Sequence, residues 1–182
     1  DNPLTIRNSP TFAISPEGNK VVYTADIKNN DERNLILLSV TDNKYRHLQG
    51  TQGAEMPFFS TDGQWVGFFA NNKLKKVSLI NGTIEELCDA PTPKGGFWTH
   101  KNTIIFSTGS IWQISEYGGT PKQLTLSPEG EQQYWPTLHP DGNTLVYNRL
   151  GQGMLAPDIT VHSLANGRKE IIINSGSYPR IS

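Results

Sequence analysis

A four-residue turn recurs four times along the chain and divides it into units of similar length. Its copies are Ser15-Pro16-Glu17-Gly18, Ser60-Thr61-Asp62-Gly63, Thr99-His100-Lys101-Asn102 and His139-Pro140-Asp141-Gly142. The last residues of successive copies are 45, 39 and 40 positions apart. Proline presets φ at the first corner, a carboxylate can accept backbone bonds, and glycine takes the positive φ of a tight hairpin. The sequence therefore predicts a repeat protein in which each turn joins two antiparallel strands.

Each turn lies between two predicted strands, and two further strands complete the unit. The run after the turn is short and almost wholly apolar, as in Trp65–Phe69, which predicts a strand covered on both faces. A third run ends in serine, a second turn such as Asn81-Gly82 follows, and a more polar fourth run suits an outer edge strand. A period of about 40 to 45 residues is that of a four-stranded propeller blade. We therefore predict an all-β chain that forms a β-propeller of four-stranded antiparallel blades.

Composition supports this fold class and narrows the possible partners. The 182 residues include 17 glycines and 12 prolines, which suits a chain dense in turns and leaves little room for helix. The formal net charge is −1, so we expect no nucleic-acid partner. The chain has no run of 18 or more apolar residues, so we expect no membrane contact by this segment.

One stretch of the second unit carries a family resemblance. Residues 57–69 read Pro-Phe-Phe-Ser-Thr-Asp-Gly-Gln-Trp-Val-Gly-Phe-Phe, and Leu-Lys-Lys-Val follows at residues 74–77. This pattern resembles the TolB-like, WD-like β-propeller repeat, and all four units match it. The third unit departs from it at Thr99–Asn102, although asparagine can adopt the left-handed conformation that glycine supplies elsewhere. With Gly53-Ala54-Glu55 before this stretch and Cys88-Asp89-Ala90-Pro91 after the blade, the sequence is also similar to the propeller part of bacterial serine/threonine kinases and of winged-helix transmembrane regulators.

The resemblance implies a non-catalytic interaction or sensory module, part of a larger bacterial protein and located in the periplasm or otherwise outside the cytoplasm. Such a module would bind a protein or a small ligand at its channel face. Propellers of this kind also serve as gating domains of prolyl-oligopeptidase-like serine peptidases, so a gating propeller whose catalytic domain lies elsewhere is the alternative. Fold alone does not choose between these two functions.

The predicted blades cover approximately residues 9–48, 55–88, 94–125 and 134–174 of a single domain, residues 1–182. Residues 178–182 restate the innermost strand of a further blade. Because the resemblance implies rings of six or more blades, about four blades would leave two open apolar faces. A second copy, a longer parent chain, or closure as a small ring with residues 4–7 as the outer strand would cover them. We prefer the first two, because residues 178–182 would be surplus in a closed ring.

No group of residues predicts catalysis, a metal or a cofactor. His47, His100, His139 and His162 are dispersed one per blade without the spacing of a zinc site. The sequence has no Gly-x-Ser-x-Gly elbow, which a hydrolase of this kind would need. We therefore predict no enzyme activity in this chain, and we interpret Cys88 as a structural thiol.

Candidate binding residues cluster where the chain enters each innermost strand, because these segments meet at the mouth of a propeller channel. They combine aromatic side chains with charge, as binding surfaces often do. The alternative for the aromatic residues, Trp135 above all, is packing between blades. The predicted partner-binding or ligand-binding residues are Trp135, Tyr134, Tyr178, Met56, Glu55, Lys94 and Arg180.

Overall fold

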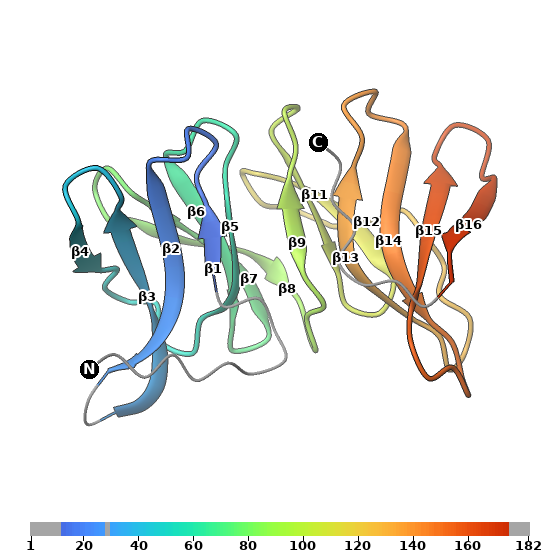
Figure 1. Ribbon diagram of the computed structural model, residues 1–182, viewed down its shortest axis with the longest axis horizontal. Coiled ribbons are helices and arrows are strands. Elements are labelled where there is room, and N and C mark those ends of the chain that lie inside the picture. The colour runs from blue at the N-terminus through green and yellow to red at the C-terminus, as the bar shows by residue number, and fades with distance from the viewer. Residues whose placement is uncertain (1–11, 28–29, 175–182) are drawn as a thin grey trace. The chain divides into compact units, whose positions relative to one another are not determined.

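The computed structural model describes residues 12–27 and 30–174, with the backbone alone at residues 26, 27 and 30–32. Sixteen strands form four four-stranded antiparallel sheets, and the described residues contain no helix (Figure 1). Each sheet takes its four strands in chain order, so each sheet is one blade of the predicted kind. The prediction of an all-β chain built from four-stranded antiparallel blades is therefore confirmed.

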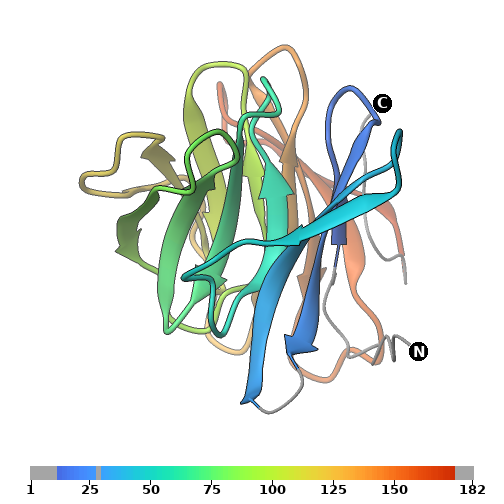
Figure 2. The ribbon, with the colours of Figure 1, turned by 90° about the vertical axis from the view of Figure 1, so that its left-hand side faces the viewer.

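The chain divides into two compact units, Asp1–Asp89 and Ala90–Ser182, and each holds two blades. In the first unit, blade 1 contains β1 (Phe12–Ile14), β2 (Lys20–Ile27), β3 (Asn30–Ser39) and β4 (Lys44–His47). Blade 2 contains β5 (Glu55–Phe59), β6 (Trp65–Ala70), β7 (Lys73–Ser78) and β8 (Ile84–Asp89). Strands β2 and β3 form the longest hairpin of this unit, seen in blue in Figure 2.

In the second unit, blade 3 contains β9 (Gly96–Trp98), β10 (Thr103–Ser107), β11 (Ile111–Ser115) and β12 (Lys122–Gln123). Blade 4 contains β13 (Gln132–Leu138), β14 (Thr144–Leu150), β15 (Asp158–Ser163) and β16 (Lys169–Ile173). Residues 4–7 and 178–182, which the sequence assigns to a closing strand and to a further blade, lie outside the described residues.

The repeated turn has the conformation that its residues predict. Gly18, Gly63 and Gly142 have φ of 72°, 64° and 73°, and Asn102 takes the same left-handed conformation with φ of 55°. In the fourth turn the Asp141 carboxylate accepts bonds from the backbone N–H groups of Asn143 (2.8 Å) and Thr144 (2.9 Å). The Asn143 bond, a further bond from the Thr144 hydroxyl (2.7 Å) and the Thr144 backbone bond hold the pKa of Asp141 at about 2, well below its ordinary value. The same bonds fix the hairpin.

The third turn is one residue shorter than the other three. Ile104 pairs with Trp98, whereas Val66 pairs with Phe59, so five residues separate the paired positions in blade 3 and six do so in blade 2. Strand pairing on both sides of the turn is nevertheless regular. Asn102 therefore has to reverse the chain within a tighter loop.

The hydrophobic core of the first unit lies between its two blades. Val22, Leu35 and Leu37 of blade 1 pack against Phe59, Val66, Phe68 and Val77 of blade 2. Strand alternation explains this core, because residues two apart on a strand share one face. In the second unit Ile105 and Ile111 of blade 3 pack in the same way against Leu145 and Tyr147 of blade 4.

Outer strands are exposed, as the polar pattern predicts. Every residue of β4 and of β16 is exposed. In blade 2 three cross-strand ion pairs fasten the outer strand: Lys73–Asp89 at 2.7 Å, Lys75–Glu86 at 2.9 Å and Lys76–Glu85 at 3.1 Å. Pairs between exposed side chains contribute little, about 0–1 kcal/mol each. The Lys76–Glu85 pair differs from a pair between exposed side chains because Lys76 is buried and its Nζ lies 4.3 Å from the Trp65 ring centroid.

Within the described residues, one face of blade 1 exposes apolar side chains. Phe12 and Ile14, which alternate with the core-facing Ala13 on β1, are 52% and 56% exposed, and Tyr45 of β4 is 68% exposed. The register places Phe12 opposite Tyr23 and Ile14 opposite Val21, so these apolar residues share the face turned away from blade 2.

The part of the chain that the structure describes contains no helix with the length and apolar character of a membrane span.

The third turn yields a direct test of its left-handed residue. We expect Asn102→Gly to preserve or raise stability, and Asn102→Val to lower it by about 1–2 kcal/mol, because a β-branched side chain is strained at positive φ. Urea unfolding measures both changes. Lys101→Val, at an exposed neighbour, is the matched control and should change stability little. Equal stability of the glycine and valine variants at position 102 would contradict this account.

Candidate functional site

Three innermost strands have a residue at positive φ within the strand or directly before it. Met56, Gly95 and Trp135 have φ of 50°, 105° and 51°. Met56 is the second residue of β5, Gly95 directly precedes β9, and Trp135 is the fourth residue of β13. In β5 and β13 the register shifts by one residue at this point. In blade 3 both Lys94 and Gly95 bond to Ser107. Each of these three segments therefore contains a β-bulge, a feature that redirects side chains and often lies beside functional sites.

Two of these positions carry bulky residues where glycine would be unstrained. A left-handed conformation costs a residue other than glycine about 1–3 kcal/mol, so the surrounding structure has to hold it in place. Met56 is buried, Trp135 is half-buried, and a proline follows each of them. Met56, Gly95 and Trp135 occupy corresponding positions of their repeats and all have positive φ, but Trp135 lies inside β13 and not at the predicted entrance of that strand.

The second unit brings three of the predicted site residues together. The Trp135 backbone N–H donates a hydrogen bond to the Lys94 carbonyl oxygen at 2.8 Å, and the Lys94 Nζ lies 5.4 Å from the Tyr134 ring centroid. All three side chains are half-buried. We call Lys94, Gly95, Tyr134 and Trp135 the entrance cluster. A cation over an aromatic face is attracted by the ring quadrupole, so this contact also orients the Lys94 charge.

The other predicted site residues are not part of this cluster. Glu55 and Met56 begin β5 in the first unit, where Glu55 is half-buried. Tyr178 and Arg180 lie outside the described residues. Lys94, Tyr134 and Trp135 are therefore the predicted site residues whose mutual geometry the structure establishes.

Gly95 is required beneath the Trp135 ring. A β-carbon on Gly95 would lie 2.5 Å from the Trp135 Cε3 atom and 3.3 Å from its Cα atom. The backbone cannot retreat easily, because Lys94 and Gly95 are bonded to Ser107. Trp135 therefore packs on the backbone of the preceding blade. The sequence analysis left packing and binding open as alternatives for Trp135, and the structure establishes the packing contact.

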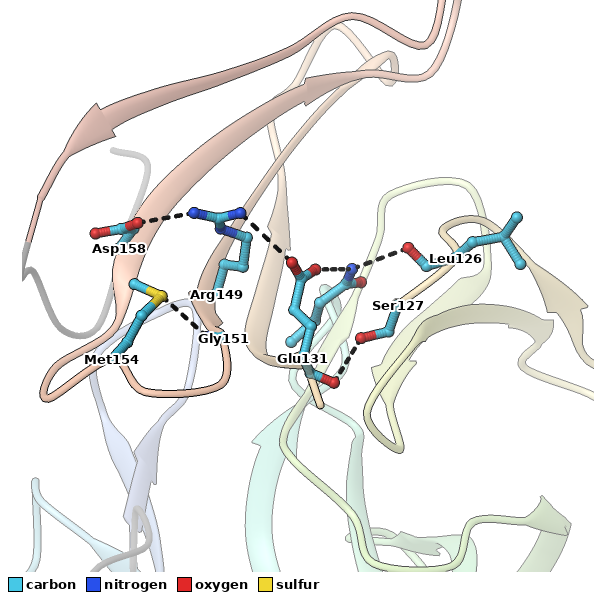
Figure 3. A network of polar contacts seen from close by, with 8 residues as sticks. Leu126, Ser127, Glu131, Arg149, Gly151, Met154 and Asp158 are labelled. Atoms are coloured by element: carbon cyan, nitrogen blue, oxygen red, sulfur yellow. Dashed lines mark hydrogen bonds and ion pairs between the residues drawn. The ribbon is translucent and has the colours of Figure 1, made fainter. Parts of the chain in front are cut away.

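The structure also contains a charged network, formed by Glu131, Arg149 and Asp158, that the sequence did not predict (Figure 3). Arg149 Nη2 donates to Asp158 Oδ2 at 3.0 Å, and Arg149 Nη1 lies 3.4 Å from Glu131 Oε2. The side chains of Arg149, Glu131 and Asp158 are 30%, 12% and 9% exposed. Register explains the contact, because Gln133, Arg149 and Asp158 lie opposite one another on β13, β14 and β15.

Gln133 joins this charged network to blade 3. Its side chain is fully buried, its Oε1 accepts a bond from the Thr125 hydroxyl, and its Nε2 donates to the Leu126 carbonyl at 3.3 Å and to Glu131 Oε1 at 3.2 Å. The Ser107 hydroxyl donates to the Gln133 carbonyl oxygen. Because the buried Gln133 amide is so fully hydrogen-bonded, it avoids the penalty of about 1–3 kcal/mol that each unpaired group would cost. The entrance end of blade 4 is therefore held by polar contacts.

Two titratable groups outside this site, Cys88 and His162, have shifted pKa values. Burial raises the pKa of the Cys88 thiol to about 11, with the neighbouring Asp89 charge adding to the effect, so the thiolate nucleophile is disfavoured. Burial and the Lys169 charge lower the pKa of His162, which favours its neutral form. Across residues 12–27 and 30–174, no cluster of three or more histidine, cysteine or acidic side chains could hold a metal ion.

Comparison with known proteins identifies the fold. No protein-family model and no curated protein sequence matches the chain. Among solved structures, a TolB-type protein from Agrobacterium tumefaciens matches with a TM-score of 0.77 at 15% identity, over 94% of this chain and 67% of that protein. TolB from Acinetobacter baumannii matches with a TM-score of 0.74 at 18% identity, over 90% of this chain and 43% of that protein.

A third similar structure is a protease propeller. The β-propeller domain of the Trilobed protease from Pyrococcus furiosus, described as having an open velcro topology, matches with a TM-score of 0.60 at 14% identity. The match covers 90% of this chain and 57% of that domain. The chain thus spans between about two fifths and two thirds of the structures it resembles.

The Gly95–Trp135 contact predicts that alanine cannot replace Gly95. We expect Gly95→Ala to destabilise the second unit, because the new methyl group meets the indole ring while φ stays positive. Thermal unfolding measures the loss of stability, and a shifted tryptophan emission reports displacement of the ring. Gly153→Ala, also at positive φ but with open space around the new methyl group, isolates the steric part. Equal effects of the two substitutions would show that the ring contact contributes nothing.

The turns predicted from the sequence, the four-stranded blades and the similarity to solved TolB structures all indicate the same architecture. This chain therefore has the TolB-like β-propeller fold.

Proposed function

We propose that this chain is a non-catalytic propeller module of a larger bacterial protein, and that it binds a protein or a small ligand through the entrance cluster. The observation that supports this proposal most is the geometry around Trp135. A bulky aromatic residue is held at positive φ beside Tyr134 and the Lys94 ammonium group. Strained backbone of this kind concentrates at ligand-binding and switching sites.

Within the entrance cluster, the Lys94 ammonium group favours an acidic group on the ligand. Arg149 is occupied by Glu131 and Asp158. Lys94 contacts the Tyr134 ring, and in the described part of the chain no carboxylate lies within ion-pair distance of it. Lys94 is therefore the cation that can still pair with a ligand carboxylate, while Tyr134 and Trp135 offer aromatic contact area.

A peptide selection tests this function. Peptides selected from a random display library on the full chain should depend on the entrance cluster. We expect Trp135→Ala and Lys94→Gln each to weaken binding of a selected peptide by about tenfold or more, as buried aromatic and charged anchors do. Fluorescence anisotropy gives the Kd, and the melting temperature checks the fold. Lys122→Gln, at an exposed lysine of β12, is the control. Unchanged affinity in both cluster variants would contradict the proposal.

A gating propeller of a serine peptidase is the second candidate, supported by the likeness to the Trilobed protease propeller. The parent sequence distinguishes the two functions. A kinase or winged-helix domain upstream supports an interaction module, which we place outside the cytoplasm. An α/β-hydrolase domain downstream supports a gating role.

We also propose that another blade covers the open face of blade 1, from a second copy or from a longer parent chain. Phe12 and Ile14 expose on this face the kind of side chains that the two-blade core buries elsewhere. We expect the isolated chain to associate at micromolar concentration, and Phe12→Ser with Ile14→Ser to return it to a monomer. Light scattering measures the mass. A clean monomer before substitution would contradict association.

A further inference from the structure

Four side chains form a square on one face of blade 4. Tyr147 and Arg149 are two residues apart on β14, and Asp158 and Thr160 are two residues apart on β15, so each pair shares a face. The register places Arg149 opposite Asp158 and Tyr147 opposite Thr160. Tyr147 belongs to the core shared with Ile105 of blade 3, so the square faces the space between blades 3 and 4.

Three polar atoms of this square are buried with no hydrogen-bond partner in the described protein: the Tyr147 hydroxyl, the Thr160 hydroxyl and Arg149 Nε. Tyr147 is 0% exposed and Thr160 is 2% exposed. An unpaired buried group costs about 1–3 kcal/mol, and nearly all such groups in native proteins bond to protein or to ordered water. Each of these three groups on the same face of the sheet therefore needs a partner other than the described side chains.

The chemistry of the three atoms specifies that partner. Arg149 Nε can only donate, so the partner has to accept a hydrogen bond, whereas the two hydroxyls can either donate or accept. Glu131 and Asp158 outnumber Arg149, and this excess negative charge disfavours an anion. Burial raises the pKa of Tyr147 to about 12; the Glu131 charge adds to this rise and the Arg149 charge opposes it. The Tyr147 hydroxyl therefore keeps its proton. A neutral oxygen satisfies all three groups.

We propose that a water molecule is bound within this square, accepts a hydrogen bond from Arg149 Nε and exchanges hydrogen bonds with the Tyr147 and Thr160 hydroxyls. Three partners are the number that buried waters usually have. Arg149 is 30% exposed, so the site lies next to a route for exchange with solvent. The water completes the charged network and supports the entrance end of blade 4, where Gln133 pairs with Arg149.

A double-mutant cycle in stability tests the site on the full chain. Tyr147→Phe and Thr160→Val remove the hydroxyls with little change of shape. With a shared water, each single variant should raise the unfolding equilibrium constant by about fivefold, the size of a typical net hydrogen bond. The double variant should also raise it by about fivefold, well short of the 25-fold expected for independent sites. Urea unfolding in buffer without glycerol or sugars gives all four values.

Two controls separate the hydroxyl effects from packing effects. Thr160→Ser keeps the hydroxyl and should keep the coupling with Tyr147→Phe. Tyr45→Phe removes a hydroxyl from a largely exposed tyrosine and should change stability little. If the hydroxyls are unsolvated, removing either one will stabilise the chain, and that result would overturn the proposal. Additive losses in the double variant, or coupling that requires added glycerol, would overturn it as well.

Discussion

Each blade has to bury both faces of a four-stranded sheet, and the rest of the structure depends on this requirement. A single sheet of this size cannot remove its apolar side chains from water, so the hydrophobic effect stabilises a blade only when another surface covers it. In the first unit Val22 and Leu37 of blade 1 face Val66 and Phe68 of blade 2 across one core. Second strands such as β6 and β10 consequently lack the alternation of polar and apolar residues that a half-exposed sheet would show.

The two ends of blade 4 differ in the chemistry of their packing. Leu138, Leu145 and Leu164 provide an apolar core near the hairpin turn, where Leu164 N–H bonds to the Asn143 carbonyl oxygen. At the other end, Gln133 and Arg149 form directional contacts with blade 3 and with neighbouring strands. Apolar packing is tolerant of small shifts, whereas hydrogen bonds fix distances and angles. The end that carries Tyr134 and Trp135 is thus the end whose geometry is specified most closely.

Local sequence was sufficient to predict the strands and turns. Glycine at Gly18, Gly63 and Gly142 and asparagine at Asn102 identify the left-handed corners, because few other residues adopt that conformation without strain. Part of the candidate site could be predicted for a similar reason, since aligned repeats place Lys94, Tyr134 and Trp135 at equivalent strand entrances. The charged network could not be predicted, because Glu131, Arg149 and Asp158 meet only through the pairing of three strands. A shift of one residue in that register would send them to opposite faces.

The short third turn shows what the repeat conserves. Blade 3 omits one residue between Trp98 and Ile104, yet the ladders on either side pair without a shift. A hairpin at the rim can lose or gain residues without moving the strands, since its backbone groups bond within the loop or to solvent. The feature that the four blades share is consequently the pairing of their strands, not the length of their turns. The number of residues in a turn can differ from one blade to the next while the four-stranded sheet keeps its pairing.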